Sequence, residues 1–313
     1  ETGLVAHHGV TALGCHAEGH VRWRAVLERG VGRDTTAAAH SALSRLRRDL
    51  GAEPDVAFVL ADGVKADGSL LADALAACPG LLFGGLAGDN YRFERSLVFA
   101  GDEIAEDAVL LLGAAGPLAA RLSAASGWLP LGAYGTVESC EKNTVRRIAG
   151  RSALEFVKAQ SGKSPGEMDL GIVPLAEYTG DDQTHFALRS PLRIDPASGA
   201  MTFFGRIAAG SRVRVCHADR AALLDGVDQA LAGILDDGFT PAAALVVSCA
   251  GRKWLLANPG FEELRRVQAC LGADLPLIGL PSFGEISPFR MADGRYSRAR
   301  FHNVTFVVCL LGR

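Results

Sequence analysis

The order of predicted secondary-structure elements repeats once along the chain, and this repeat restricts the possible folds more than any other feature. The first copy is predicted as a helix over 35–50, a strand over 56–60, a helix over 67–77, a strand over 81–83 and a strand over 108–112. The second copy has the same order over 220–235, 244–247, 261–271, 277–278 and 305–311. Because helices and strands alternate in both copies, the sequence predicts an α/β protein with two related lobes.

Short apolar runs dominate the region between the two copies, at 172–175, 186–188 and 212–215. They predict a mixed, strand-rich middle region. A chain of 313 residues is longer than one hydrophobic core usually serves, so two domains are expected. We place these domains at 4–150 and 151–313.

Each copy contains a strand that ends in glycines followed by an acid, Gly88-Asp89 in the first copy and Gly284-Glu285 in the second. Glycine lets a second backbone or a ligand approach closely. The carboxyl ends of parallel strands are also where α/β sheets bind ligands. One interpretation is that turns from both lobes face a shared cleft, and the alternative is that these glycines only make tight turns.

Composition and motif content argue against several classes of function. The net charge is −3 and no basic cluster contains aromatic residues, so the chain has no electrostatic basis for binding nucleic acid. The longest apolar run, 304–311, is far shorter than the ~20 residues needed to span a membrane, and no signal peptide is visible, which favours a cytoplasmic protein. Seven cysteines without a CxxC motif argue against a disulfide framework and against a zinc site. No phosphate-binding loop, dinucleotide-binding turn or nucleophile elbow occurs, and no metal site is predicted.

The stretch SCAGR, which follows the apolar strand at 244–247, has three interpretations. Arg252 would activate a Cys249 thiolate, with His302 as its base, in an enzyme. Cys249 would instead be a buried thiol, and Arg252 would pair with a carboxylate such as Glu285. In the third interpretation, Arg252, Glu285 and His302, which follow three strand ends of the second copy, line a ligand pocket.

Several motifs in order resemble the FIST sensory domain family. They are LLFGGLAGDN, SGWLPLG, FFGRIAAGSRVRV, VVSCAGRKWLL, PLIGLPSFGEI and FHNVTFVVCLLG, and the resemblance covers nearly the whole chain from about residue 35. The family usually has a complete strand–helix–strand unit before its first Gly-Cys turn, whereas this chain starts almost at Gly14-Cys15. The first domain is therefore expected to be a FIST N-type domain that is either truncated at its start or short, and the second a FIST C-type domain.

The resemblance implies a non-catalytic, bacterial signal-input module that binds a small molecule and regulates a separate partner. The partner would be a histidine kinase or a cyclic-dinucleotide signalling enzyme. Arg252 would bind a carboxylate of the ligand, and Glu285 or Asp89 would bind an amino group, so an amino-acid-like ligand is expected. The residues expected to bind the ligand are Gly84, Gly85, Asp89, Asn90, Cys249, Arg252, Ser282, Glu285, His302 and Asn303.

One branch of the family resembles haem-binding nitric-oxide sensors, which gives an alternative function. A haem iron needs a neutral imidazole as its axial ligand. The candidates in this chain are His16, His20, His40, His185, His217 and His302.

Overall fold

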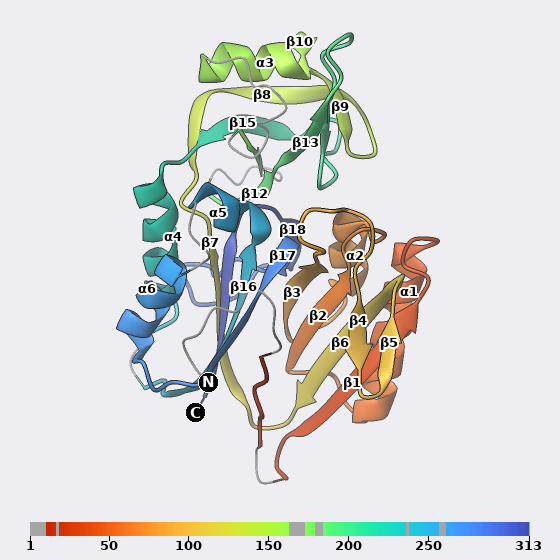
Figure 1. Cartoon of the computed structure of the whole chain (residues 1–313), viewed down its shortest axis with the longest axis vertical. Helices are drawn as coiled ribbons and strands as arrows, with labels where there is room; N and C mark the ends of the chain where they lie inside the picture. Colours follow the sequence, from red (N-terminus) through yellow and green to blue (C-terminus); the bar gives the residue numbers. More distant parts are fainter. Residues whose placement is uncertain are drawn as a thin grey trace.

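The sequence repeat folds into two halves of one continuous sheet (Figure 1). The computed structural model describes residues 11–16, 19–162, 173–178, 184–235, 238–256 and 261–312, so the predicted start of the first domain at residue 4 lies outside the described residues. Within these ranges the main sheet has nine strands in the order β1-β6-β2-β3-β17-β16-β19-β7, with β18 paired to β17. Their bounds are β1 Arg22–Arg29, β2 Val56–Asp62, β3 Leu81–Ala87, β6 Ala108–Ala115, β7 Ala119–Ala125, β16 Pro241–Cys249, β17 Leu277–Ser287, β18 Arg300–His302 and β19 Phe306–Gly312.

The two halves of the main sheet have the same pattern. In each half two parallel strands, β2 with β3 and β16 with β17, are followed by an antiparallel strand, β6 or β19. The halves join where β3 and β17 pair antiparallel, with Gly85 opposite Glu285. The prediction of two related α/β lobes is therefore confirmed, and the lobes share one sheet.

Two helices accompany each half. Helices α1 (Thr35–Leu50) and α2 (Gly68–Leu75) pack with the first half, and α4 (Arg220–Ala232) and α6 (Phe261–Leu271) with the second. Asp34 caps α1 by accepting a hydrogen bond from the Ala37 amide, and the left-handed Gly51 ends the helix. The apolar face that the spacing predicts, which includes Leu43 and Leu46, is buried.

The middle of the chain forms a second, eight-stranded sheet above the main sheet in Figure 1. All of its pairings are antiparallel, and its order is β12-β11-β15-β8-β9-β14-β13, with β10 paired to β9. The bounds are β8 Leu129–Glu141, β9 Thr144–Ile148, β10 Arg151–Ser152, β11 Leu175–Tyr178, β12 Phe186–Arg189, β13 Pro191–Ile194, β14 Met201–Phe203 and β15 Arg212–His217. Helix α3 (Ala153–Ser161) packs on β8 and β9, and β4 (Val98–Ala100) and β5 (Glu103–Ala105) form a separate hairpin. This sheet draws strands from both sides of the domain border expected at 150.

The sequence patterns miss several elements, which include the strands β7, β8, β9, β13 and β14. For two further elements, α5 and β1, the reason is visible in the structure. The residues after Cys249, predicted as a turn, form the short helix α5 (Ala250–Leu255), whose N-cap Cys249 makes no side-chain capping hydrogen bond. The sequence therefore lacks the Ser, Thr, Asp or Asn that usually marks a helix start. Strand β1 was not predicted because Arg22, Arg24 and Arg29 give it the charged character of an edge strand.

Candidate ligand-binding site

Glu285 is the centre of a buried polar cluster where the two halves of the main sheet meet. One carboxylate oxygen accepts a hydrogen bond from the Ser282 hydroxyl. The other accepts from the Thr305 amide at 3.1 Å and from the Thr305 hydroxyl at 2.7 Å. Burial raises the pKa of Glu285 to about 7, although these hydrogen bonds and one from Cys249 lower it.

Gly84 and Gly85 allow the strands around Glu285 to approach closely. A Cβ atom at Gly85 would lie 2.7 Å from the Gly284 carbonyl oxygen, and one at Gly84 would lie 1.9 Å from the Val59 carbonyl oxygen. Gly84 also has a φ of 146°, which disfavours any other residue. Both glycines therefore have a packing role at the junction of the two halves.

Arg252 is fully buried and all three nitrogens of its guanidinium are hydrogen-bonded to protein atoms. Its Nε donates to Glu263 at 2.8 Å, so its carboxylate partner is Glu263 and not Glu285. One terminal nitrogen donates to the Ser126 and Val304 carbonyls, and the other to the Leu223 carbonyl at 2.7 Å. The side chain thus links α5 to α6, to α4 and to the segments that flank the second half of the main sheet.

Two further polar residues expected in the site, Asn303 and Asp89, hydrogen-bond to backbone groups of the protein. Asn303 joins the two sheets, because its side-chain oxygen accepts from the Ser190 backbone amide at 3.2 Å and its backbone amide donates to the Leu188 carbonyl at 3.1 Å. The Asp89 carboxylate accepts from three backbone amides of residues 93–95 and closes the turn that follows β3. Asn90 is exposed in the same turn.

His302 differs from these residues because one of its ring nitrogens has no partner among the described residues. Nε2 lies 3.0 Å from the Ser287 carbonyl oxygen, which can only accept, so Nε2 carries the proton and Nδ1 presents its lone pair. Nδ1 is buried and makes no hydrogen bond. Burial, together with the nearby charges of Arg189 and Arg300, lowers the pKa of His302 to about 3, although the hydrogen bond to Ser287 raises it, so the ring is neutral at pH 7.

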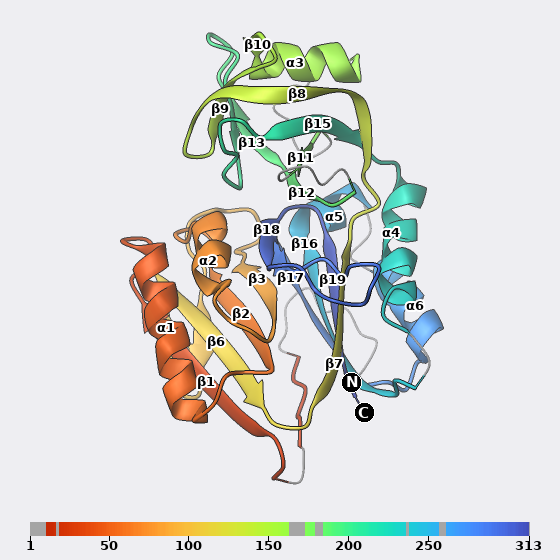
Figure 2. The same cartoon turned by 180° about the vertical axis from the view of Figure 1, so that it is seen from behind.

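His302 lines a pocket of about 370 Å³ where the main sheet, the second sheet and α4 meet. Figure 2 shows β7 continuing upward into β8 beside α4. The lining residues are Ala124, Ala125, Ser126, Gly127, Trp128, Leu129, Thr184, His185, Phe186, Leu188, Ala222, Asp225, Gln229, Phe289, His302 and Thr305. Of the ten residues predicted to bind ligand, His302 is the one in this lining.

Trp128 is the most informative lining residue that the sequence prediction missed. It is 3% exposed, and its indole nitrogen has no hydrogen-bond partner among the described residues. Its SGWLPLG stretch belongs to the FIST-like motifs, but a tryptophan between two strands is equally typical of a hydrophobic core. The unpartnered indole nitrogen beside the pocket is the feature that indicates a role in ligand binding and not in core packing alone.

The geometry gives a direct prediction about Cys249. Burial raises the pKa of this thiol, and the charge of Glu285 raises it further. His302 bonds to Ser287, and no described contact joins it to Cys249. We therefore expect a maleimide probe at pH 7.5 to label the exposed Cys15 and Cys270 in the native protein and to leave Cys249 unlabelled, as read by peptide mass spectrometry. Labelling of Cys249 as fast as Cys270 would favour the enzyme interpretation.

Comparisons with known proteins identify the family. The FIST N domain family matches residues 1–151, and the FIST C domain family matches residues 152–288. This chain belongs to the FIST family. The resemblance seen in the motifs is thereby confirmed, and FIST domains are sensory, ligand-binding signalling domains. None of the described helices is long and apolar enough to cross a bilayer.

Other comparisons add little to this assignment. No curated protein matches the chain. A solved structure titled "Structure of PurLQS from Thermotoga maritima" is similar over 93% of this chain and 72% of that chain, at 12% identity and a TM-score of 0.28. A likeness this low carries no argument about fold or function.

Proposed function

We propose that this FIST chain binds a small polar molecule in the pocket beside His302 and transmits the binding event to a separate signalling protein. The observation that carries the proposal is the position of the pocket, which is lined by the β7–β8 connection, α4, the start of β12 and β18. A ligand that touches all four elements would favour one relative arrangement of the two sheets. Such a difference in affinity between two arrangements is what a sensor requires.

An amino-acid-like ligand depends on Arg252 binding a carboxylate. In this structure Arg252 already donates to Glu263 and to backbone carbonyls, so that ligand would require the guanidinium to exchange partners. Asp225, which lines the pocket, offers a carboxylate for an amino group, but it already pairs with Arg266 at 3.6 Å. An amino-acid-like ligand would therefore have to exchange ion-pair partners at both of its charged groups.

The haem alternative has a poor fit to the described residues. His302 and His185 line the pocket, but about 370 Å³ is near the lower end of the range for drug-sized ligands, and haem is a larger, rigid macrocycle. His16, His20, His40 and His217 are exposed and do not line the pocket.

The signalling partner is proposed from the family alone. FIST domains act as signalling sensors, and the expected partner is a histidine kinase or a cyclic-dinucleotide signalling enzyme. Ligand-dependent binding between this chain and such an enzyme would support that assignment.

Calorimetry with a panel of small metabolites tests the proposed function. Ala222 lines the pocket, whereas its neighbour Ala221 is exposed and does not. We expect at least one metabolite to bind with one-to-one stoichiometry, and Ala222→Leu to weaken that binding at least about 10-fold by filling the pocket, while Ala221→Leu leaves it unchanged. Absence of any bound metabolite, or equal binding by both variants, would overturn the proposal.

A further inference from the structure

The pocket contains two buried nitrogens that lack hydrogen-bond partners within the described residues, Trp128 Nε1 and His302 Nδ1. Both side chains are at least nine-tenths buried, at 3% and 1% exposure. Native proteins pair nearly all such atoms, because an unpaired buried polar group is unfavourable. Two such atoms in the lining of one pocket therefore indicate a bound molecule that forms hydrogen bonds with both.

The two nitrogens have opposite hydrogen-bonding roles. Indole Nε1–H can only donate. His302 Nδ1 can only accept, since Ser287 fixes the proton on Nε2 and burial keeps the ring neutral at pH 7. A ligand that satisfies both atoms must carry an acceptor for Trp128 and an N–H or O–H donor for His302.

The rest of the lining restricts the charge and shape of the ligand. None of the described lining residues is lysine or arginine, so a carboxylate or phosphate would be left without a cation. The Asp225 carboxylate already pairs with Arg266 at 3.6 Å, so a cationic ligand would have to displace that ion pair. Besides His302, four ring side chains, Trp128, His185, Phe186 and Phe289, line the pocket, and the His185 and Phe289 rings lie 5.1 Å apart between centroids. Flat apolar walls of this kind favour a planar ring.

From these observations we infer that the pocket binds an uncharged, planar cyclic amide, a ring that carries a carbonyl group and an N–H group. The carbonyl accepts from Trp128 Nε1, and the N–H donates to His302 Nδ1. This inference rests on the proposed function, because it assigns the chemical class of the molecule that the same pocket senses.

The test uses the side-chain NMR signals of the two nitrogens in the 15N-labelled full chain, with uracil and 2-pyrrolidone as cyclic-amide probes. The chain has three tryptophans, so three indole N–H signals are expected, and Trp128→Phe assigns the one in the pocket. We expect the Trp128 indole signal and the His302 Nδ1 signal to shift together and saturably with a cyclic amide. Glutamate and inorganic phosphate are expected to shift neither.

Matched variants measure the contribution of each bond. Trp128→Phe and His302→Phe are each expected to weaken cyclic-amide binding roughly 10-fold, as loss of one buried hydrogen bond predicts. The controls are Trp254→Phe and His40→Phe, whose wild-type side chains are exposed and do not line the pocket, and they should bind the probes as the wild type does. The indole signals of Trp23 and Trp254 report whether each single variant is folded. If one of the two pocket variants does not fold, the other still tests the inference.

Two outcomes would overturn the inference while leaving the proposed function intact. One is a metabolite that Ala222→Leu displaces but that Trp128→Phe and His302→Phe bind normally. The other is binding of glutamate or phosphate in the pocket without binding of either cyclic amide. If no small molecule binds at all, the inference and the proposed function both fail.

Discussion

Arg252→Ala is expected to lower the free energy of unfolding by about 3–5 kcal/mol, the range for breaking a buried ion pair. The change leaves the Glu263 carboxylate, 5% exposed as a residue, without its cation. It also leaves the Leu223 and Ser126 carbonyls without the donors that Arg252 provides. Urea unfolding followed by circular dichroism measures the loss.

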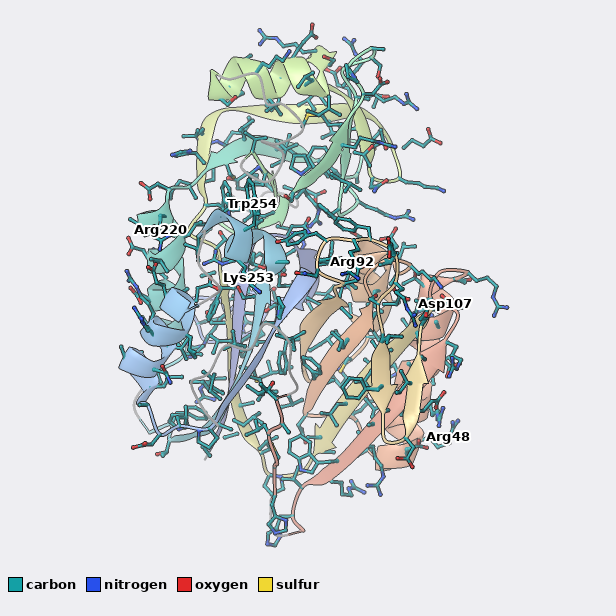
Figure 3. All side chains as sticks on the ribbon, viewed as in Figure 1. Arg48, Arg92, Asp107, Arg220, Lys253 and Trp254 are labelled. Carbon is teal, nitrogen blue, oxygen red and sulfur yellow. The ribbon has the colours of Figure 1, made fainter. Side chains whose placement is uncertain are left out.

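Two further variants separate the structural role of Arg252 from a role in ligand binding. Lys253→Ala changes the next residue on α5, which is half-buried beside Trp254 (Figure 3), and is expected to change stability by less than about 0.5 kcal/mol. Arg252→Met combined with Glu263→Leu removes the unpaired Glu263 charge and is expected to recover that part of the loss, while the Leu223 and Ser126 carbonyls still lack the donors that Arg252 provides. If Arg252→Ala costs less than about 1 kcal/mol and abolishes metabolite binding, Arg252 is the ligand clamp that the sequence predicts.

The second large effect is a pair of opposed pH dependences at His302 and Glu285. The pKa of His302 is about 3 in the folded protein, below its ordinary value of 6.5, so the unfolded chain binds more protons between these values and stability falls as the pH drops from 6.5 to 3. The full contribution is roughly 5 kcal/mol at about 1.4 kcal/mol per pH unit. The pKa of Glu285 is about 7, above its ordinary 4.5, so the folded chain binds more protons and stability falls as the pH rises from 4.5 to 7. That contribution is about 3 kcal/mol.

Between pH 4.5 and 6.5 the two pH dependences of stability have opposite signs and offset each other in the wild type. A variant is therefore needed to measure either one. Glu285→Gln keeps an oxygen for the Thr305 donors and places an amide N–H against Ser282, as a protonated Glu285 would. We expect its stability relative to wild type to increase by about 3 kcal/mol between pH 4.5 and 7.5. Glu94→Gln, at an exposed carboxylate, should show a constant difference. A constant difference for Glu285→Gln as well would mean that Glu285 is ionised throughout this range.

Much of the fold follows from sequence patterns because local signals and burial agree. Helices α1 and α6 have the predicted bounds, 35–50 and 261–271. The repeat predicts two related lobes, since each copy must bury the same apolar faces. The pairing of β3 with β17 could not be predicted, because it joins strands almost 200 residues apart and depends on Gly84 and Gly85.

The site was less predictable than the fold. Strand-end position brings Glu285, Ser282 and Cys249 together, and Thr305, which was not among the predicted site residues, joins them. A sequence does not show which of these polar groups satisfy one another. Arg252 finds Glu263 across α5 and α6, and its hydrogen bonds are then complete. His302 alone keeps an unpaired nitrogen in the pocket lining among the residues predicted from motifs.

The most direct measurement is an electron-density map of the full chain purified quickly from cells, or soaked with the cyclic amide that binds best. The account predicts density for a planar molecule in the pocket, within hydrogen-bond distance of Trp128 Nε1 and His302 Nδ1. Density for a ligand between Arg252 and the turn at residues 84–90, with the pocket beside Trp128 filled by protein side chains, would contradict it.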